Sequence, residues 1–88
     1  MTQPSVAELP DLPGARFLGD LARGGVAWRV FFEINTEHAP VRGRVHFASE
    51  SEQRATGWIF VEPTEEELLT RFHEFSALEL WRLLESLA

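Results

Sequence analysis

Cysteine and lysine are both absent from the 88 residues of this sequence. Without cysteine the chain can form neither disulfides nor thiolate metal sites, which stabilise many small domains. A domain of this size buries only about 60% of the surface that its unfolded chain exposes. Self-association is a remaining means by which such a chain can bury more apolar surface.

All eight basic residues are arginine, and 14 acidic residues bring the formal net charge to −6. Because arginine replaces lysine along the whole chain, we attribute this bias to overall composition and not to one binding site. Residues 16–48 carry five arginines against three acidic residues, whereas residues 50–88 carry three arginines against nine. The middle of the chain is therefore mildly basic and its C-terminal part is strongly acidic.

Long apolar segments and targeting segments are also missing. No stretch approaches the ~20 apolar residues of a membrane span. The first residues have neither the basic start nor the apolar run of a secretory signal. We therefore expect a cytoplasmic protein with no membrane partner.

Motifs that would indicate an enzyme or a bound cofactor are absent. There is no G-x-S-x-G, no phosphate-binding loop and no dinucleotide fingerprint. The three histidines fall on a predicted loop, strand and helix, and their spacing is not that of shared metal ligands: His38, His46 and His73. No residue argues for catalysis, and we expect no metal and no cofactor.

The chain divides into a short tail and one domain. Residues 1–13 contain three prolines among small and acidic residues, so we expect a flexible tail there. Residues 14–88 are predicted to form a single domain.

The start of this domain, residues 14–23, fits two structures. In a helix, Phe17, Leu18 and Leu21 would share one face. In a strand, Phe17, Gly19 and Leu21 would alternate, and the following pair of glycines would form a hairpin turn. The glycines favour the strand.

Three later segments alternate between apolar and polar residues, as strands do. They are Val26–Ile34, Val41–Ser49 and Arg54–Glu62, and the links between them are short. The apolar side of the first two segments carries Trp28, Val30, Phe32, Val45 and Phe47. Short links between successive strands predict an antiparallel meander.

Two capping boxes predict two helices after the strands. Thr64 and Glu67 start the first helix, and Ser76 and Glu79 start the second, with a junction near Phe75. Each helix has an apolar face that must pack on the sheet. The predicted fold is therefore α+β, a two-layer sandwich of a three- or four-stranded antiparallel meander and two C-terminal helices on one face.

The last strand segment, Arg54–Glu62, decides what the uncovered face of the sheet carries. Polar residues at the ends of one side favour placing that side outward, with Trp58 and Phe60, and placing Ile59 and Val61 inward. The opposite facing, with Trp58 in the core, stays open because a shift of one residue reverses every side chain.

The uncovered face of the sheet is the predicted interaction site. It combines basic and aromatic residues: Arg29, Phe31, Arg42, Arg44, His46, Trp58 and Phe60. Cross-strand pairs of Arg42 or Arg44 with Glu33 or Glu62 would explain the charges. They would not explain three large rings on an open face, which indicate a binding surface.

We therefore expect a small non-enzymatic interaction domain that forms a homodimer through this face. An unidentified protein is a further candidate partner. The alternative is a weak single-stranded nucleic-acid binder whose aromatic rings stack on bases. Because an acidic body repels phosphate, we do not expect nucleic acid as a partner. A small metabolic enzyme or ligand-binding subunit ranks third.

The two capping boxes generate a stability prediction. Thr64→Ala and Ser76→Ala should each lower the free energy of unfolding by about 1 kcal/mol, because each removes a helix N-cap. Ser86→Ala, which removes no N-cap, should change it very little. Denaturant midpoints measure the difference, and equal midpoints for the three variants would contradict the two-helix prediction.

Overall fold

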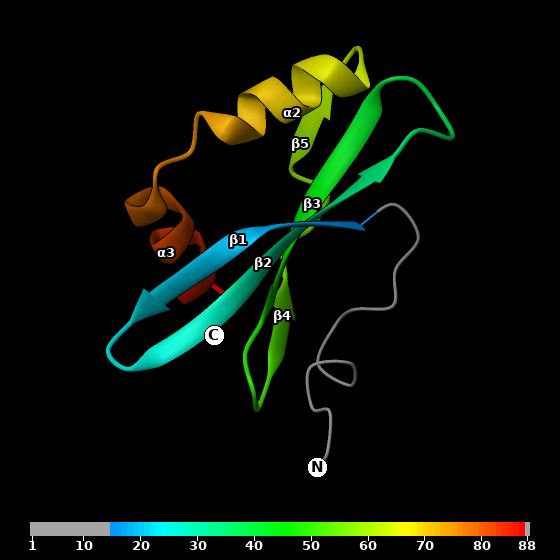
Figure 1. Cartoon of the computed structure of the whole chain (residues 1–88). Coiled ribbons are helices and arrows are strands. Elements are labelled where there is room, and N and C mark those ends of the chain that lie inside the picture. Colours follow the sequence, from blue (N-terminus) through cyan, green and yellow to red (C-terminus); the bar gives the residue numbers. More distant parts are fainter. Residues whose placement is uncertain (1–14, 88) are drawn as a thin grey trace.

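The computed structural model describes residues 15–87, which form five strands and two helices (Figure 1). The strands are β1 (Ala15–Arg23), β2 (Val26–Asn35), β3 (Val41–Ala48), β4 (Gln53–Ala55) and β5 (Phe60–Glu62). The helices are α2 (Glu65–His73) and α3 (Ala77–Glu85). The sheet is antiparallel, with the order β1-β2-β3-β4, and β5 also pairs with β3. The predicted tail, residues 1–13, lies outside the described residues.

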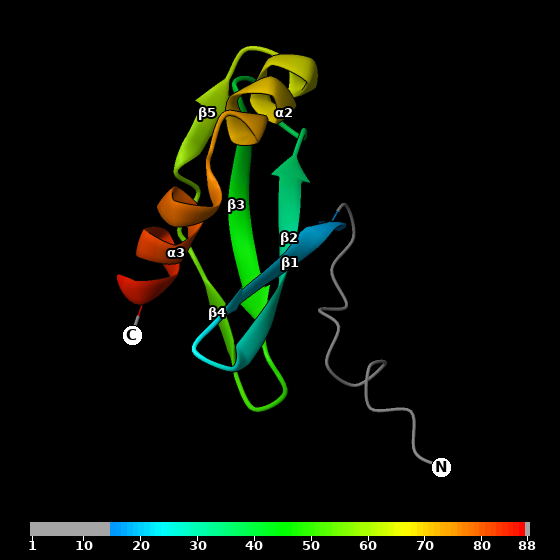
Figure 2. The same ribbon diagram turned by 60° about the vertical axis from the view of Figure 1, so that its left-hand side comes forward.

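Both helices pack on the same side of the sheet (Figure 2). The core between the two layers contains the apolar side of β2 and β3 together with Leu68, Phe72 and Leu84 of the helices. The predicted α+β sandwich is therefore confirmed. Neither described helix is long and apolar enough to cross a membrane.

The ambiguous residues after the tail form a strand, which hairpins into β2 through Gly24 and Gly25. The predicted alternation of Phe17, Gly19 and Leu21 is wrong, because the register of β1 against β2 shifts between Phe17 and Gly19. Gly19 has φ 153°, a backbone conformation that side chains disfavour, and this residue allows the bulge. The bulge turns Leu18 and Leu21 toward the core and leaves Phe17 exposed.

The predicted strand Arg54–Glu62 is interrupted, and its expected facing is wrong in both β4 and β5. Between β4 and β5 the ladder is replaced by contacts of Thr56, whose hydroxyl accepts a hydrogen bond from the Val45 N–H at 3.0 Å. Beyond this break Phe60 is buried in the core, while Ile59 and Val61 are exposed. The facing is the same on both sides of the interruption, because Arg54 lies opposite Phe47 and Phe60 lies opposite Gly43, on the side of the helices. Phe60 therefore faces the helices and not the open side.

The centre of the core is a cluster of phenylalanine rings. Phe32 stacks on Phe72 at a centroid distance of 4.6 Å and meets Phe60 edge to face at 5.3 Å. A Cβ atom on Gly43 would lie 2.5 Å from the Phe32 ring and 3.1 Å from Leu68. Glycine at this position of β3 therefore gives the ring the room that it occupies.

The helix starts follow the predicted caps. The Thr64 hydroxyl accepts a hydrogen bond from the Glu67 N–H at 3.2 Å, and Ser76 accepts one from the Glu79 N–H at 3.1 Å. Only the second helix has the reciprocal bond of a capping box, in which the Glu79 carboxylate accepts from the Ser76 N–H. In the first helix the Glu67 carboxylate accepts from the Thr64 hydroxyl instead.

The close contact at Gly43 generates a second prediction. Gly43→Ala should lower the free energy of unfolding by about 1–3 kcal/mol, because the added methyl group overpacks the ring cluster. Gly57→Ala is the matched control, since a Cβ atom there meets nothing within 4 Å. Chemical denaturation of both variants compares them, and equal stability would contradict the described packing.

Candidate functional site

The side of the sheet that faces away from the helices is here named the outer face. By the alternation of β2 and β3 it carries Arg29, Phe31, Glu33, Arg42, Arg44 and His46. Trp58 joins this face through its contact with Arg44, whereas Phe60 does not belong to it. The structure therefore brings together six of the seven residues that the sequence predicted.

An ion-pair network occupies the β3 half of the outer face. The Glu33 Oε1 atom accepts hydrogen bonds from Arg44 Nε at 2.7 Å and from His46 Nε2 at 2.8 Å. Because a carboxylate only accepts, this contact assigns a proton to Nε2 of His46. The cross-strand pair of Arg44 with Glu33 was one of the predicted pairs, and it is confirmed.

The network determines the charge state of Glu33. Burial would by itself raise the pKa of this carboxyl, but the hydrogen bonds and charges of His46 and Arg44 more than offset it, so the pKa is lowered. One carboxylate oxygen accepts from both donors, so it holds both side chains in place across β2 and β3. The charges of Glu33, Arg44 and His46 are therefore satisfied within one chain.

Arg44 makes a second contact on the same face. Its guanidinium carbon lies 4.4 Å from the centroid of the Trp58 ring, which is a cation–π geometry. Trp58 is half-buried as a result. The ring and the cation that the sequence placed on this face thus contact each other, and Arg44 is also bound to Glu33.

The β1–β2 half of the outer face has a different character. Phe17 of β1 packs edge-on against Phe31 of β2 at a centroid distance of 5.5 Å. Phe31 is only 6% exposed, whereas Phe17 is 55% exposed. The expectation that Phe31 is an exposed ring is therefore wrong, and the exposed ring on this face is Phe17.

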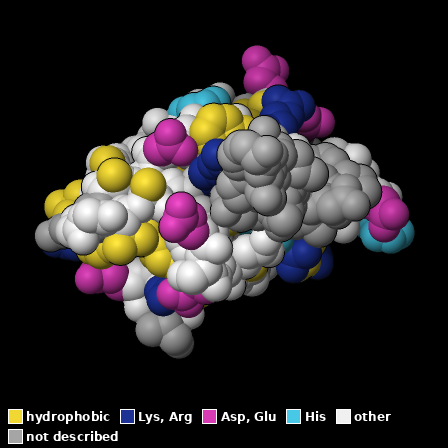
Figure 3. Space-filling view, turned by 60° about the horizontal axis from the view of Figure 1, so that its bottom comes forward, with side chains coloured by type: hydrophobic (Ala, Val, Ile, Leu, Met, Phe, Trp, Pro, Cys, Tyr) yellow, Lys and Arg dark blue, Asp and Glu magenta, His cyan; other side chains and the backbone are white. Residues whose placement is uncertain are grey.

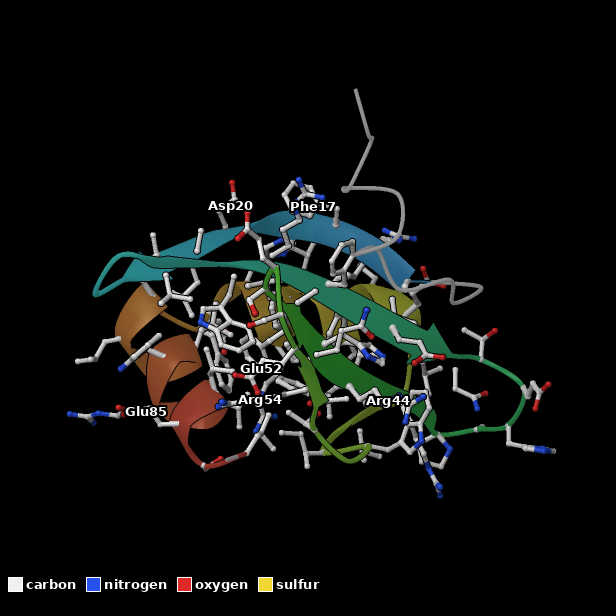
Figure 4. All side chains as sticks on the ribbon, turned by 90° about the horizontal axis from the view of Figure 1, so that it is seen from below. Phe17, Asp20, Arg44, Glu52, Arg54 and Glu85 are labelled. Carbon is white, nitrogen blue, oxygen red and sulfur yellow. The ribbon has the colours of Figure 1, made fainter. Side chains whose placement is uncertain are left out.

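Two charged residues stand beside these rings. Asp20 and Arg29 are direct cross-strand neighbours, and with Phe17 and Phe31 they line a shallow depression of about 410 Å³. Within residues 15–87, neither Asp20 nor Arg29 has an ion-pair partner within 4 Å. Figure 4 shows Phe17 and Asp20 together on β1, apart from Arg44 on β3.

Sequence reasoning missed Phe17 and Asp20 as members of the outer face. The regular alternation predicted for this strand placed Phe17 on the same side as Leu21, which packs in the core. The glycine in mid-strand was the available signal, because an isolated glycine in a strand often marks a bulge. A bulge changes which residues share a face.

The remaining predicted residue, Arg42, is exposed near the other end of β3, opposite Val61 of β5. Val61 is therefore an exposed apolar residue at this end of the outer face, and other exposed large apolar residues are Val26 on β2, Leu78 on α3 and Ile59 before β5. Figure 3 shows hydrophobic side chains interspersed with acidic and basic ones on the face that it displays. Within the described chain, no group of three His, Asp or Glu side chains is placed to hold a metal ion.

A second depression, of about 440 Å³, lies between α3 and the start of β4. Arg54 forms part of its wall: its guanidinium lies 5.0 Å from the Trp28 ring centroid and donates to the Leu84 carbonyl at 3.4 Å. Glu52 pairs with the same guanidinium at 3.1 Å. Figure 4 shows these two residues near the end of α3 that carries Glu85. Arg54 therefore joins the last turn of α3 to the sheet.

The lowered pKa of Glu33 generates a third prediction. Because the folded-state pKa lies below the unfolded value, the carboxylate stabilises the fold above the unfolded pKa, and this contribution is lost as pH falls through the folded pKa. Glu33→Gln should therefore lower the free energy of unfolding at pH 7 on the order of 1 kcal/mol. The difference from the wild type should shrink below about pH 4.

The control for this variant is Glu50→Gln, which removes an exposed carboxylate from the β3–β4 turn. Denaturant titrations at neutral and acidic pH measure both variants. A Glu33→Gln chain as stable at pH 7 as Glu50→Gln would contradict the described network.

The geometry of the outer face is the available guide to what it binds. No protein-family model, no curated protein and no solved structure matches this chain.

Proposed function

We propose that this chain is a non-enzymatic interaction domain that self-associates through the outer face, with Phe17 at the centre of the contact. The observation that carries the proposal is a ring that is 55% exposed on a sheet face and rests on a second, buried ring. Burying a phenylalanine side chain contributes roughly 1.5–3 kcal/mol. Phe31 supports Phe17 from below, so little side-chain freedom remains to be lost on binding.

The distribution of polar groups on the outer face supports a patch with an apolar centre and a polar edge. The rings of β1 and β2 supply the centre, and the ion-pair network of Glu33, Arg44 and His46 lies beside them on β3. Interfaces commonly combine an apolar core with a polar rim. The network needs no partner, so it can remain at the rim without loss on binding.

The size of the chain supports self-association in particular. A small domain without disulfides gains stability when a second copy covers its apolar surface. A different protein with a complementary surface is the other occupant that this face could accept. Light scattering of the pure chain separates the two, because only self-association raises its mass.

The alternative of a single-stranded nucleic-acid binder has less support. Such binding uses free cations for phosphate and open rings for bases. Arg44 is bound to Glu33 and covers Trp58, and the chain has a formal net charge of −6. We therefore do not adopt it.

The proposal generates a fourth prediction. Phe17→Glu should convert the dimer into a folded monomer with an unchanged circular dichroism spectrum, because it places a charge at the centre of the contact. Leu78→Glu is the matched control: Leu78 is 50% exposed, receives the same substitution, and lies on α3 away from the outer face. Light scattering over a concentration series that starts at about 1 µM measures the mass. A dissociation constant of about 1 µM corresponds to a binding free energy of about −8.2 kcal/mol.

Two outcomes would contradict the proposal. In one, the wild-type chain keeps its monomer mass of 10.0 kDa over the whole series. In the other, Phe17→Glu and Leu78→Glu dissociate the dimer equally, so that the outer face has no special role.

A further inference from the structure

The β1–β2 ribbon of the outer face carries pairs of residues that lie directly opposite each other across the two strands. Phe17 faces Phe31, and Asp20 faces Arg29. Nearer the turn the pair is Ala22 with Ala27, both exposed and both small. The first member of each pair belongs to β1 and the second to β2.

This arrangement has a geometric consequence for a symmetric dimer. Consider a two-fold axis that lies in the plane of the interface and runs along the strands, between β1 and β2. Rotation about it lays β1 of one copy over β2 of the other, and the reverse. Phe17 of each copy then faces Phe31 of the other, and Asp20 of each copy faces Arg29 of the other.

The charges favour this arrangement. Within the described residues Asp20 and Arg29 have no ion-pair partner within 4 Å, and they border the depression beside Phe17 and Phe31. A neutral apolar surface placed on this depression would desolvate both charges and would itself supply an opposite charge to neither. A second copy in the two-fold arrangement supplies an opposite charge to each, so the surface is complementary to itself.

Association through the exposed edge of β1 fits the structure less well. Strand addition requires a regular edge, and the bulge between Phe17 and Gly19 interrupts the ladder in the middle of this strand. The face of the ribbon is continuous across the same residues. The contact is therefore expected between faces and not between edges.

We infer that two copies of this chain pack β1–β2 ribbon against β1–β2 ribbon about a two-fold axis, with two reciprocal Asp20–Arg29 ion pairs flanking the Phe17 and Phe31 rings. This inference rests on the proposed self-association. It specifies the partner surface, the symmetry and the charge pairs that set the orientation of the two copies.

Charge exchange between two variants tests the inference. Asp20→Arg alone brings two arginines together at each of the two contacts, and Arg29→Asp alone brings two aspartates together. Each variant should dimerise at least about tenfold more weakly than the wild type. An equimolar mixture should form a heterodimer, because every contact then joins Arg to Asp. The chain with both substitutions should again form a homodimer.

The measurements are sedimentation of each variant and of the mixture, with native mass spectrometry to identify the heterodimer. Arg42→Asp is the matched control, since it makes the same charge change on the outer face, at a residue on β3 away from the inferred axis. It should weaken the dimer much less than Arg29→Asp. Circular dichroism verifies that every variant is folded. The doubly substituted chain repeats the charge-exchange test with one protein in place of a mixture of two.

The outcomes separate this inference from the proposal on which it rests. In one outcome, Phe17→Glu dissociates the dimer, but neither the mixture of the two charge variants nor the doubly substituted chain forms a dimer. This outcome would overturn the two-fold arrangement and leave self-association through the outer face intact. A wild-type chain that stays monomeric would overturn both. Recovery of dimer in the mixture alone, without recovery in the doubly substituted homodimer, would also contradict the inferred symmetry, because both contain the same pairs.

Discussion

The packing of the Phe32 ring is the contact on which the rest of the structure depends. This fully buried ring lies between the sheet and α2, stacks on Phe72, and occupies the space over Gly43 that a larger residue would fill. The contact fixes α2 on the side of β2 and β3 that Phe32 faces. Glu33 follows Phe32 directly in β2, so its side chain points to the opposite side, which the helices leave uncovered. The existence of an outer face is thus a consequence of core packing.

The two halves of the outer face differ in how far their charges and rings are paired or covered within the chain. On the β3 side, one carboxylate accepts from Arg44 and His46, and Arg44 also covers a tryptophan ring, so these groups are satisfied within the chain. On the β1–β2 side, an exposed ring stands next to an acid and a base that have no ion-pair partner in the described chain. This difference directs the proposed contact to the first two strands, because burial there gains apolar area and charge pairing together.

The bulge in β1 and the register of β5 on β3 produce this division. The bulge at Gly19 turns Phe17 to the outer face while keeping Leu18 and Leu21 in the core. The break after β4 contains the Thr56 contacts to Val45, and beyond it the pairing of Phe60 with Gly43 places Phe60 among the core rings. The bulge shifts β1 by one position against β2, and a shift of one position exchanges the two faces. The registers of β4 and β5 against β3 differ by two positions, so these two strands keep the same facing. As a result, the open face has fewer exposed rings than regular alternation predicts, and a different ring is exposed.

The sequence by itself determined the class of the fold, the two helices and the facing of β2 and β3. These follow from local properties: capping residues at Thr64 and Ser76, and unbroken alternation over many residues. It also predicted the pair of Arg44 with Glu33, since cross-strand neighbours of opposite charge attract. Only the tertiary structure decided the facing of Phe17 and Phe60, because a bulge and the register of a short strand depend on how the strand pairs with its neighbour and packs against the other layer. A strand's own residues do not specify that pairing, so the face that we propose as the contact could be located only in three dimensions.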